Sequence, residues 1–138
     1  MRDMYHNVKV SQLLDPDTLT DSQDSAEVDM QGYDSLNVHF AMGESGDALS
    51  GSLKWTLKLQ HSDTSGSGWE DVTAAETLNG AATITVDAAA EDDAVYTFGY
   101  NGGKRFVQAV ATATGSHSNG TPMAILAVQG HANLKPTV

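Results

Sequence analysis

The chain contains no cysteine among its 138 residues. This absence excludes a disulfide framework, a thiolate-bound zinc or iron–sulfur centre and a cysteine nucleophile. Positive charge is also scarce, because the chain has seven Lys and Arg residues and 18 Asp and Glu residues, which gives a net charge of −11. That charge has the wrong sign for a protein that neutralises phosphates or lies on an anionic membrane. The sequence therefore predicts no nucleic-acid partner and no membrane partner.

Long apolar runs are missing as well. The longest uncharged apolar stretch, from Pro122 to Val128, is far shorter than the roughly 20 residues that a membrane helix needs. The first seven residues include no apolar segment of the kind found in a secretory signal. We therefore expect a soluble protein that carries no targeting signal of its own.

Small residues dominate the composition. Ala, Gly, Ser and Thr fill 55 of the 138 positions, whereas charged residues make up only 18%. A chain of this length is typical of one compact domain with a single core. We expect residues 1–138 to form one domain whose surface is neutral and rich in hydroxyl groups.

Alternation of apolar and polar residues predicts strands over most of the chain. Residues 53–60 alternate strictly, with Trp55, Leu57 and Leu59 on one face and lysines, Thr56 and Gln60 on the other. A period of two is typical of a half-buried strand. The same interpretation applies to further segments: 28–30, 36–40, 84–86, 95–100, 105–114 and 124–130.

Turn residues separate these segments every 10 to 15 positions. This spacing predicts an all-β protein, an antiparallel β-sandwich resembling a jelly roll, with about eight strands and little helix. Asn101-Gly102-Gly103, between two strands, is the strongest hairpin signal. Residues 71–78 and 88–93 have helix-forming alanines, but no apolar stripe, so we expect one helical turn at most.

The two ends leave alternatives open. The polar, turn-prone segment 15–24 separates the first 14 residues from the remaining strands. Residues 1–14 are then either the first strand of the sandwich or an arm that contacts a neighbouring subunit. Residues 131–138 are predicted to form a short tail, either without contacts or as a second contact arm.

No chemical site is evident. Four acidic residues lie close together as in a calcium loop, namely Asp15, Asp17, Asp21 and Asp24. The central Gly and the closing Glu of such a loop are missing, so a solvated turn is favoured. The histidines, namely His6, His39, His61, His117 and His131, show no ligand-pair spacing. His39 should face away from the core. No serine lies in a nucleophile elbow. We expect no metal, no cofactor and no enzymatic activity.

Aromatic residues offer one further hypothesis. Trp55 lies on the apolar face of its strand and is predicted to be a core residue. Trp69, which follows a Gly/Ser-rich loop, is either packed or available for stacking against a sugar. Trp69, Tyr100 and Tyr33 are therefore the candidate stacking surfaces of a carbohydrate-binding module.

The run from Leu57 to Val72 resembles a pattern of small virion proteins of tailed bacteriophages and gene transfer agents. In that pattern a strand ending in Leu-Gln-x-Ser-Asp leads through a small-residue loop to an aromatic residue and Asp-Val. Three further pieces fit the same order, namely residues 1–3 with 8–10, residues 28–35 and residues 99–110. The Gly/Ser-rich segment 63–68 and the Ala-rich segment 73–94 depart from the pattern.

The resemblance implies a capsid decoration (cement) protein on the outer face of a phage head, with no catalytic residue. The expected partners are the major capsid protein and further copies of the chain, with a trimer favoured. The negative charge favours the outside of a DNA-filled shell, after synthesis in the host cytoplasm. The alternative is the base of a head spike or fibre, or a carbohydrate-binding module for host attachment.

Overall fold

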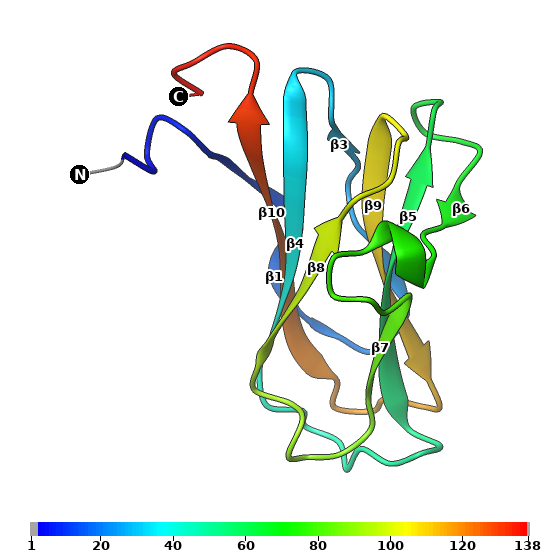
Figure 1. Cartoon of the computed structure of the whole chain (residues 1–138). Coiled ribbons are helices and arrows are strands. Elements are labelled where there is room, and N and C mark those ends of the chain that lie inside the picture. Colours follow the sequence, from blue (N-terminus) through cyan, green and yellow to red (C-terminus); the bar gives the residue numbers. More distant parts are fainter. Residues whose placement is uncertain (1–2, 138) are drawn as a thin grey trace.

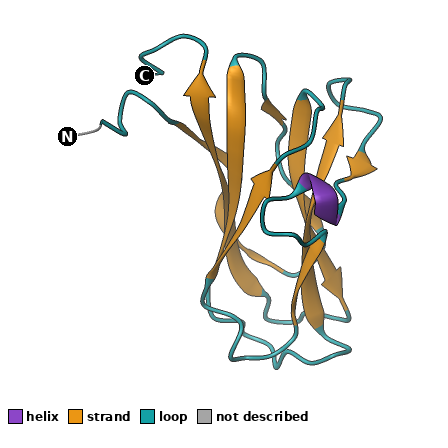
Figure 2. Ribbon diagram, viewed as in Figure 1, coloured by secondary structure: helices purple, strands orange, loops and turns teal. Residues whose placement is uncertain are grey.

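A computed structural model describes residues 3–137 as two antiparallel sheets packed face to face (Figures 1 and 2). Sheet A has the order β1-β10-β4-β8, and sheet B has the order β2-β9-β5-β6, with β3 also paired to β9 and β7 to β5. The strands are β1 (Lys9–Leu19), β2 (Gln23–Asp24), β3 (Val28–Asp29), β4 (Tyr33–Met42), β5 (Lys54–Ser62), β6 (Glu70–Asp71), β7 (Thr83–Val86), β8 (Val95–Tyr100), β9 (Phe106–Thr114) and β10 (Thr121–Ala132). The predicted all-β sandwich is thus confirmed.

The chain crosses repeatedly between the two layers. β1, β4, β8 and β10 belong to sheet A, while the strands between them in sequence belong to sheet B. Two strand positions of sheet B are each divided into short pieces, β2 with β3 and β6 with β7, so the ten strands occupy eight positions. This alternation is the arrangement of a jelly roll.

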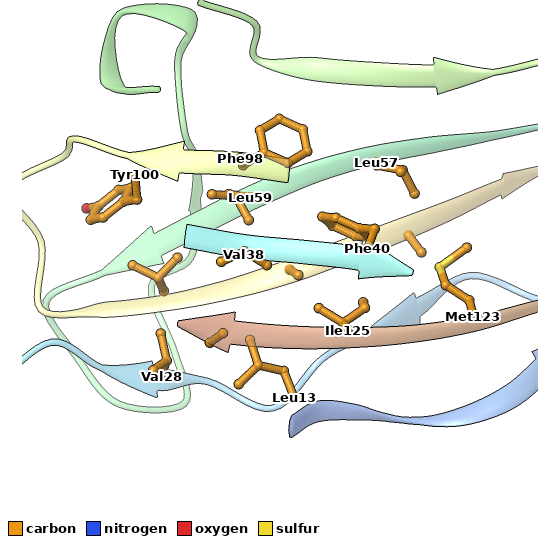
Figure 3. Close-up of a cluster of buried hydrophobic side chains, with 14 of the residues drawn as sticks. Leu13, Val28, Val38, Phe40, Leu57, Leu59, Phe98, Tyr100, Met123 and Ile125 are labelled. Carbon is orange, nitrogen blue, oxygen red and sulfur yellow. The ribbon is translucent and has the colours of Figure 1, made fainter. Parts of the chain in front are cut away.

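The core lies between the inner faces of the sheets (Figure 3). Trp55, Leu57 and Leu59 of β5 are completely buried, and they face Phe40 of β4 and Ile125 of β10. The alternation of apolar and polar residues in β5 therefore reflects a half-buried strand, as predicted, since one face packs in the core and the other faces solvent. Each other predicted strand segment also overlaps an observed strand.

The hairpin predicted at residues 101–103 is wrong. β8 pairs with β4 in sheet A, and β9 pairs with β5 in sheet B, so this loop crosses from one sheet to the other. Gly102 lies against the Tyr100 ring, where a Cβ would come within 2.4 Å of the phenolic oxygen. The glycine is thus explained by close packing within a crossover rather than by a tight turn between paired strands.

The first strand is longer than the sequence predicts. β1 continues through Pro16 to Leu19, with irregular register between Gln12 and Leu14 and between Leu14 and Asp17. Pro16 is accommodated because β1 is the edge strand of sheet A and Pro16 lies in a bulge, where no ladder hydrogen bond is lost. Residues 15–19 are therefore strand and not turn.

The two ends of the chain lie together. Residues 9–14 form part of β1 within the chain's own sheet, and β10 extends to Ala132, two residues into the predicted tail. Thr137 donates backbone and hydroxyl hydrogen bonds to the carbonyl oxygens of His6 and Val8, at 3.1 and 2.8 Å. Both terminal segments leave the sandwich at the same end (Figure 1). Residues 1, 2 and 138 lie outside the described part of the chain.

Helix is limited to one 3-10 turn, Ala74–Glu76, within the described residues. Thr73 precedes it, and the Glu76 carboxylate accepts hydrogen bonds from the Thr73 backbone and hydroxyl at 2.9 Å. The expectation of a single turn in this segment is confirmed. Within residues 3–137, no helix has the length and hydropathy required to cross a membrane.

Candidate functional site

Two of the three predicted stacking residues come together. Tyr33 begins β4 and Tyr100 ends β8, and both line one pocket, whereas Trp69 is half-buried before β6 and does not line it. Tyr100 is only 6% exposed, so its ring has no open face. The structure thus removes Tyr100 as a stacking surface and leaves Tyr33, which is half-buried. Trp55 is fully buried, as predicted.

This loop-end pocket has a volume of about 440 Å³ and opens at one end of the sandwich. Its walls are the segment before β4, the crossover after β8 and the start of the loop after β5. Its lining comprises Met30, Gln31, Tyr33, Asp34, Asp63, Tyr100, Asn101, Gly102, Gly103, Lys104 and Arg105. The volume is within the range of about 300–1,000 Å³ that small-molecule sites occupy.

Both cations of the pocket are already paired with carboxylates outside its lining. Arg105 donates two hydrogen bonds of 2.8 Å to Asp29 and one to the Gln31 side-chain oxygen, and the Lys104 ammonium contacts Glu70. Hydrogen bonds from Arg105 lower the pKa of Asp29 to about 2. The positive charges are therefore compensated within the protein, and an anionic ligand gains little from them.

A buried hydrogen bond between His61 and Tyr100 holds one wall of the pocket in place. His61 is 3% exposed, and its Nδ1 lies 2.9 Å from the Tyr100 hydroxyl, which also accepts the Lys104 backbone N–H at 3.1 Å. Burial raises the pKa of the Tyr100 hydroxyl. The second ring nitrogen of His61 lies 4.0 Å from the Glu76 carboxylate. These contacts fix the crossover against sheet B.

One serine–histidine hydrogen bond is formed within residues 3–137, and it does not have the features of an activated nucleophile. Ser62 follows His61, but its hydroxyl donates to the Ser67 carbonyl. Ser35 Oγ lies 2.8 Å from His131 Nδ1, a contact between β4 and β10 that sequence spacing cannot reveal. No described carboxylate hydrogen-bonds His131, so the third member of a triad is missing from residues 3–137.

The strand-paired residues on the outer face of sheet A include no Asp, Glu, Lys or Arg, and a carboxylate contacts them at the β1 edge, where Asp15 accepts a hydrogen bond from the Gln12 amide. Residues directly opposite one another in antiparallel strands share a face, and the register therefore aligns three rows across the sheet. The rows are Val10–Val128–Asn37–Gly99, Gln12–Leu126–His39–Thr97 and Ala124–Ala41–Val95. We call these residues the uncharged face. His39 lies there, outside the core as predicted, and its Nδ1 is 2.8 Å from the Thr97 hydroxyl.

The outer face of sheet B is different. Lys58 reaches Asp71 with a 2.9 Å ion pair, and Lys54, Asp24 and Asp29 occupy positions on the same side. Solvated sheet faces usually carry such residues. The two outer faces of one sandwich therefore have opposite character, although the chain as a whole is strongly acidic.

The exposed large hydrophobic side chains of the described residues gather around sheet A. Val10 is 60% and Val95 64% exposed on the uncharged face, and Leu78, at 73%, lies over Gly99 of that face. The remaining three, Met4, Tyr5 and Leu134, belong to the terminal segments beside sheet A. Met4 also lines a groove of about 760 Å³ together with Asn37 and Val128 of the uncharged face. An apolar area of this kind is typical of an interaction surface.

Three of the four acidic residues considered for calcium line one depression without forming a metal-ligand group. Asp15 and Asp17 lie on β1 and Asp24 on β2, beside a shallow depression at the edge of the sandwich. Asp21 lies in the intervening loop. No group of three or more potential metal ligands is formed within residues 3–137.

Comparison of the chain with protein-family models, with curated proteins and with solved structures found no match.

Proposed function

We propose that the chain is a non-enzymatic structural protein of a phage-like particle, a decoration protein that binds the outer face of the capsid. The resemblance of its sequence to small virion proteins supports this proposal. The observation that carries it is the uncharged face, whose rows run across β1, β10, β4 and β8 and include the exposed side chains of Val10 and Val95.

Burying an unpaired charge in an interface is expensive, whereas burying Val or Leu contributes about 1.5–3 kcal/mol for a fully covered side chain. Leu126, Val128, Val10 and Val95 lie on a face whose strand-paired residues include no Asp, Glu, Lys or Arg. Charges lie at its margins, at Asp15 beside Gln12 and at Asp3 and Lys135 of the groove. Sheet B offers no comparable area, because lysines and carboxylates interrupt it.

The acidic charge fits the outer surface of a shell filled with DNA. A net charge of −11 repels packaged nucleic acid. The terminal segments project from sheet A at the side of the groove, where they add contact area next to the uncharged face. Copies of the chain associate around local threefold positions in this proposal, each with its uncharged face against the capsomers or a neighbouring copy.

The test compares two lysine substitutions on opposite faces. Leu126→Lys places a charge in the middle row of the uncharged face, and Thr56→Lys places one at an equivalent central position of sheet B. Binding to particles stripped of the protein should be lost for Leu126→Lys and kept for Thr56→Lys, with both variants still folded by circular dichroism. Equal binding by the two variants contradicts the proposal.

Cryo-electron microscopy of the particle provides the second test. The proposal expects density for the chain across the capsid lattice. Density restricted to a vertex, the neck or the tail overturns it and favours the base of a head spike or fibre.

A further inference from the structure

We propose that the loop-end pocket is a binding site for a neutral sugar ring. This inference does not depend on where the protein sits on a particle. It starts from the fact that three loops distant in sequence meet around one cavity, and that the cavity contains an aromatic ring, carboxylates and amides.

The charge of the pocket selects the class of ligand. Arg105 and Lys104 are engaged by Asp29 and Glu70. Asp34 and Asp63 are exposed and make no side-chain hydrogen bond within residues 3–137. A phosphate or uronic acid would meet two free carboxylates and no unpaired cation of the lining, whereas sugar hydroxyls can donate hydrogen bonds to both carboxylates. Lys9, whose ammonium lies 6.0 Å from the centroid of the Tyr33 ring, is outside the lining.

The remaining lining completes a site for a polyhydroxylated ring. Tyr33 supplies an aromatic side chain, against which the apolar face of a sugar packs well. Asn101, which is exposed, supplies an amide that can both donate and accept. A few convergent polar groups beside apolar surface are typical of small-molecule sites.

The floor of the pocket is fixed before any ligand arrives. Tyr100 is held by His61 and by the Lys104 backbone N–H, and Gly102 packs on its ring. Gly103 is different, because a Cβ there meets no atom within 4 Å and its backbone is not in the left-handed region. The position is therefore open space at the pocket, which a side chain can fill without disturbing the fold.

This difference gives a matched pair of variants. Gly103→Phe should block the pocket, and Gly51→Phe should not, since Gly51 also has nothing within 4 Å of its Cβ position but lies in the turn before β5, at the other end of that strand. Both variants should keep the melting temperature of the parent chain. Tyr33→Ala and Asp34→Asn should weaken binding by about tenfold or more, and Trp69→Ala should leave it unchanged.

The experiment is a nuclear magnetic resonance titration of the full chain with methyl glycosides of glucose, galactose and mannose, N-acetylglucosamine, glucosamine and glucuronate. We expect at least one neutral sugar to shift the amide signals of Asp34, Asn101 and Gly103 at millimolar concentration. Gly103→Phe should abolish these shifts and Gly51→Phe should preserve them.

Three results overturn the inference. The first is the absence of shifts at these amides with every neutral sugar, and the second is binding of glucuronate as tight as that of the neutral sugars. The third is binding of glucosamine alone, which would identify a site for cations. Gly103→Phe should still bind particles and Leu126→Lys should still bind sugar, so failure of this site is distinguishable from failure of the decoration role.

Discussion

The indole Nε1–H of Trp55 donates a 2.9 Å hydrogen bond to the Thr121 hydroxyl, and both residues are completely buried. Trp55 belongs to sheet B and Thr121 to sheet A, so the bond joins the two layers inside the core. The Thr121 hydroxyl in turn donates to the Ser45 hydroxyl at 2.9 Å. A short polar chain therefore satisfies the only polar atom of the largest core side chain.

Replacing Thr121 with Val tests this bond. The shape of the side chain is kept, but the buried indole N–H loses its acceptor, which costs about 1–3 kcal/mol of unfolding free energy. Urea denaturation of the purified chain should show this decrease. Thr121→Ser, which keeps the hydroxyl, should remain closer to the parent chain, and an equally large loss for Thr121→Ser would contradict the hydrogen-bond explanation.

Local patterns predicted the strands well, because the cause of each pattern is local. In β5 every second side chain faces the core, so burial alternates along Trp55, Leu57 and Leu59. Pairing between strands is not local. Asn101-Gly102-Gly103 has the composition of a hairpin turn, yet β8 and β9 on its two sides lie in different sheets, and no local pattern reports this.

The candidate sites were less predictable for the same reason. The sequence predicts Tyr33 and Tyr100 as stacking surfaces, but only the crossover places them in one pocket and buries Tyr100. The uncharged face depends on the register of four strands, in which Val10, Val128 and Asn37 align. The sequence predicts a turn at Pro16, but the residue lies within β1. A strand can accommodate this proline because β1 is at the edge of its sheet, which the sequence does not report.

Two adjacent glycines should respond differently to alanine. A Cβ at Gly102 would lie 2.4 Å from the Tyr100 hydroxyl oxygen and 2.5 Å from ring atoms, so the crossover must shift. A Cβ at Gly103 meets nothing within 4 Å. We expect Gly102→Ala to lower the melting temperature clearly. Gly103→Ala should leave it unchanged or raise it slightly. Alanine lowers the conformational entropy of the unfolded chain, which stabilises the fold by about 0.4–1 kcal/mol.

Thermal denaturation followed by circular dichroism checks both glycine variants under the same conditions. A Gly103→Ala variant that melts as early as Gly102→Ala would show that both positions need glycine for their backbone. Close packing on the Tyr100 ring would then not be the reason for the glycine at position 102.

Acid should weaken the contact between Asp29 and Arg105. Hydrogen bonds from Arg105 hold the pKa of Asp29 at about 2 in the folded chain, below the ordinary value of 3.8. A lowered pKa stabilises the fold above the ordinary pKa, and this contribution disappears as the pH falls from about 4 to about 2. Since the Asp29 side chain is 43% exposed, solvent screening limits the contribution to about 1 kcal/mol or less.

Asp29→Asn should therefore lower stability at neutral pH and lose less stability than the parent chain between pH 4 and pH 2. Urea midpoints measured across this range check the prediction. Asp21→Asn is the control, because the Asp21 side chain forms no hydrogen bond within residues 3–137. Parallel acid profiles for the parent chain and Asp29→Asn would contradict the assignment.

Tyr100→Phe tests whether the Tyr100 hydroxyl anchors the crossover. Its loss leaves His61 Nδ1 and the Lys104 backbone N–H without their partner at 2.9 and 3.1 Å. An unsatisfied buried polar group costs about 1–3 kcal/mol, so the urea midpoint should fall. Tyr33→Phe, the matched control, removes a hydroxyl that makes no hydrogen bond within residues 3–137 and should leave stability unchanged. Hydrogen exchange should accelerate at Lys104 in Tyr100→Phe alone, and equal exchange in both variants would show that the backbone holds the crossover without the hydroxyl.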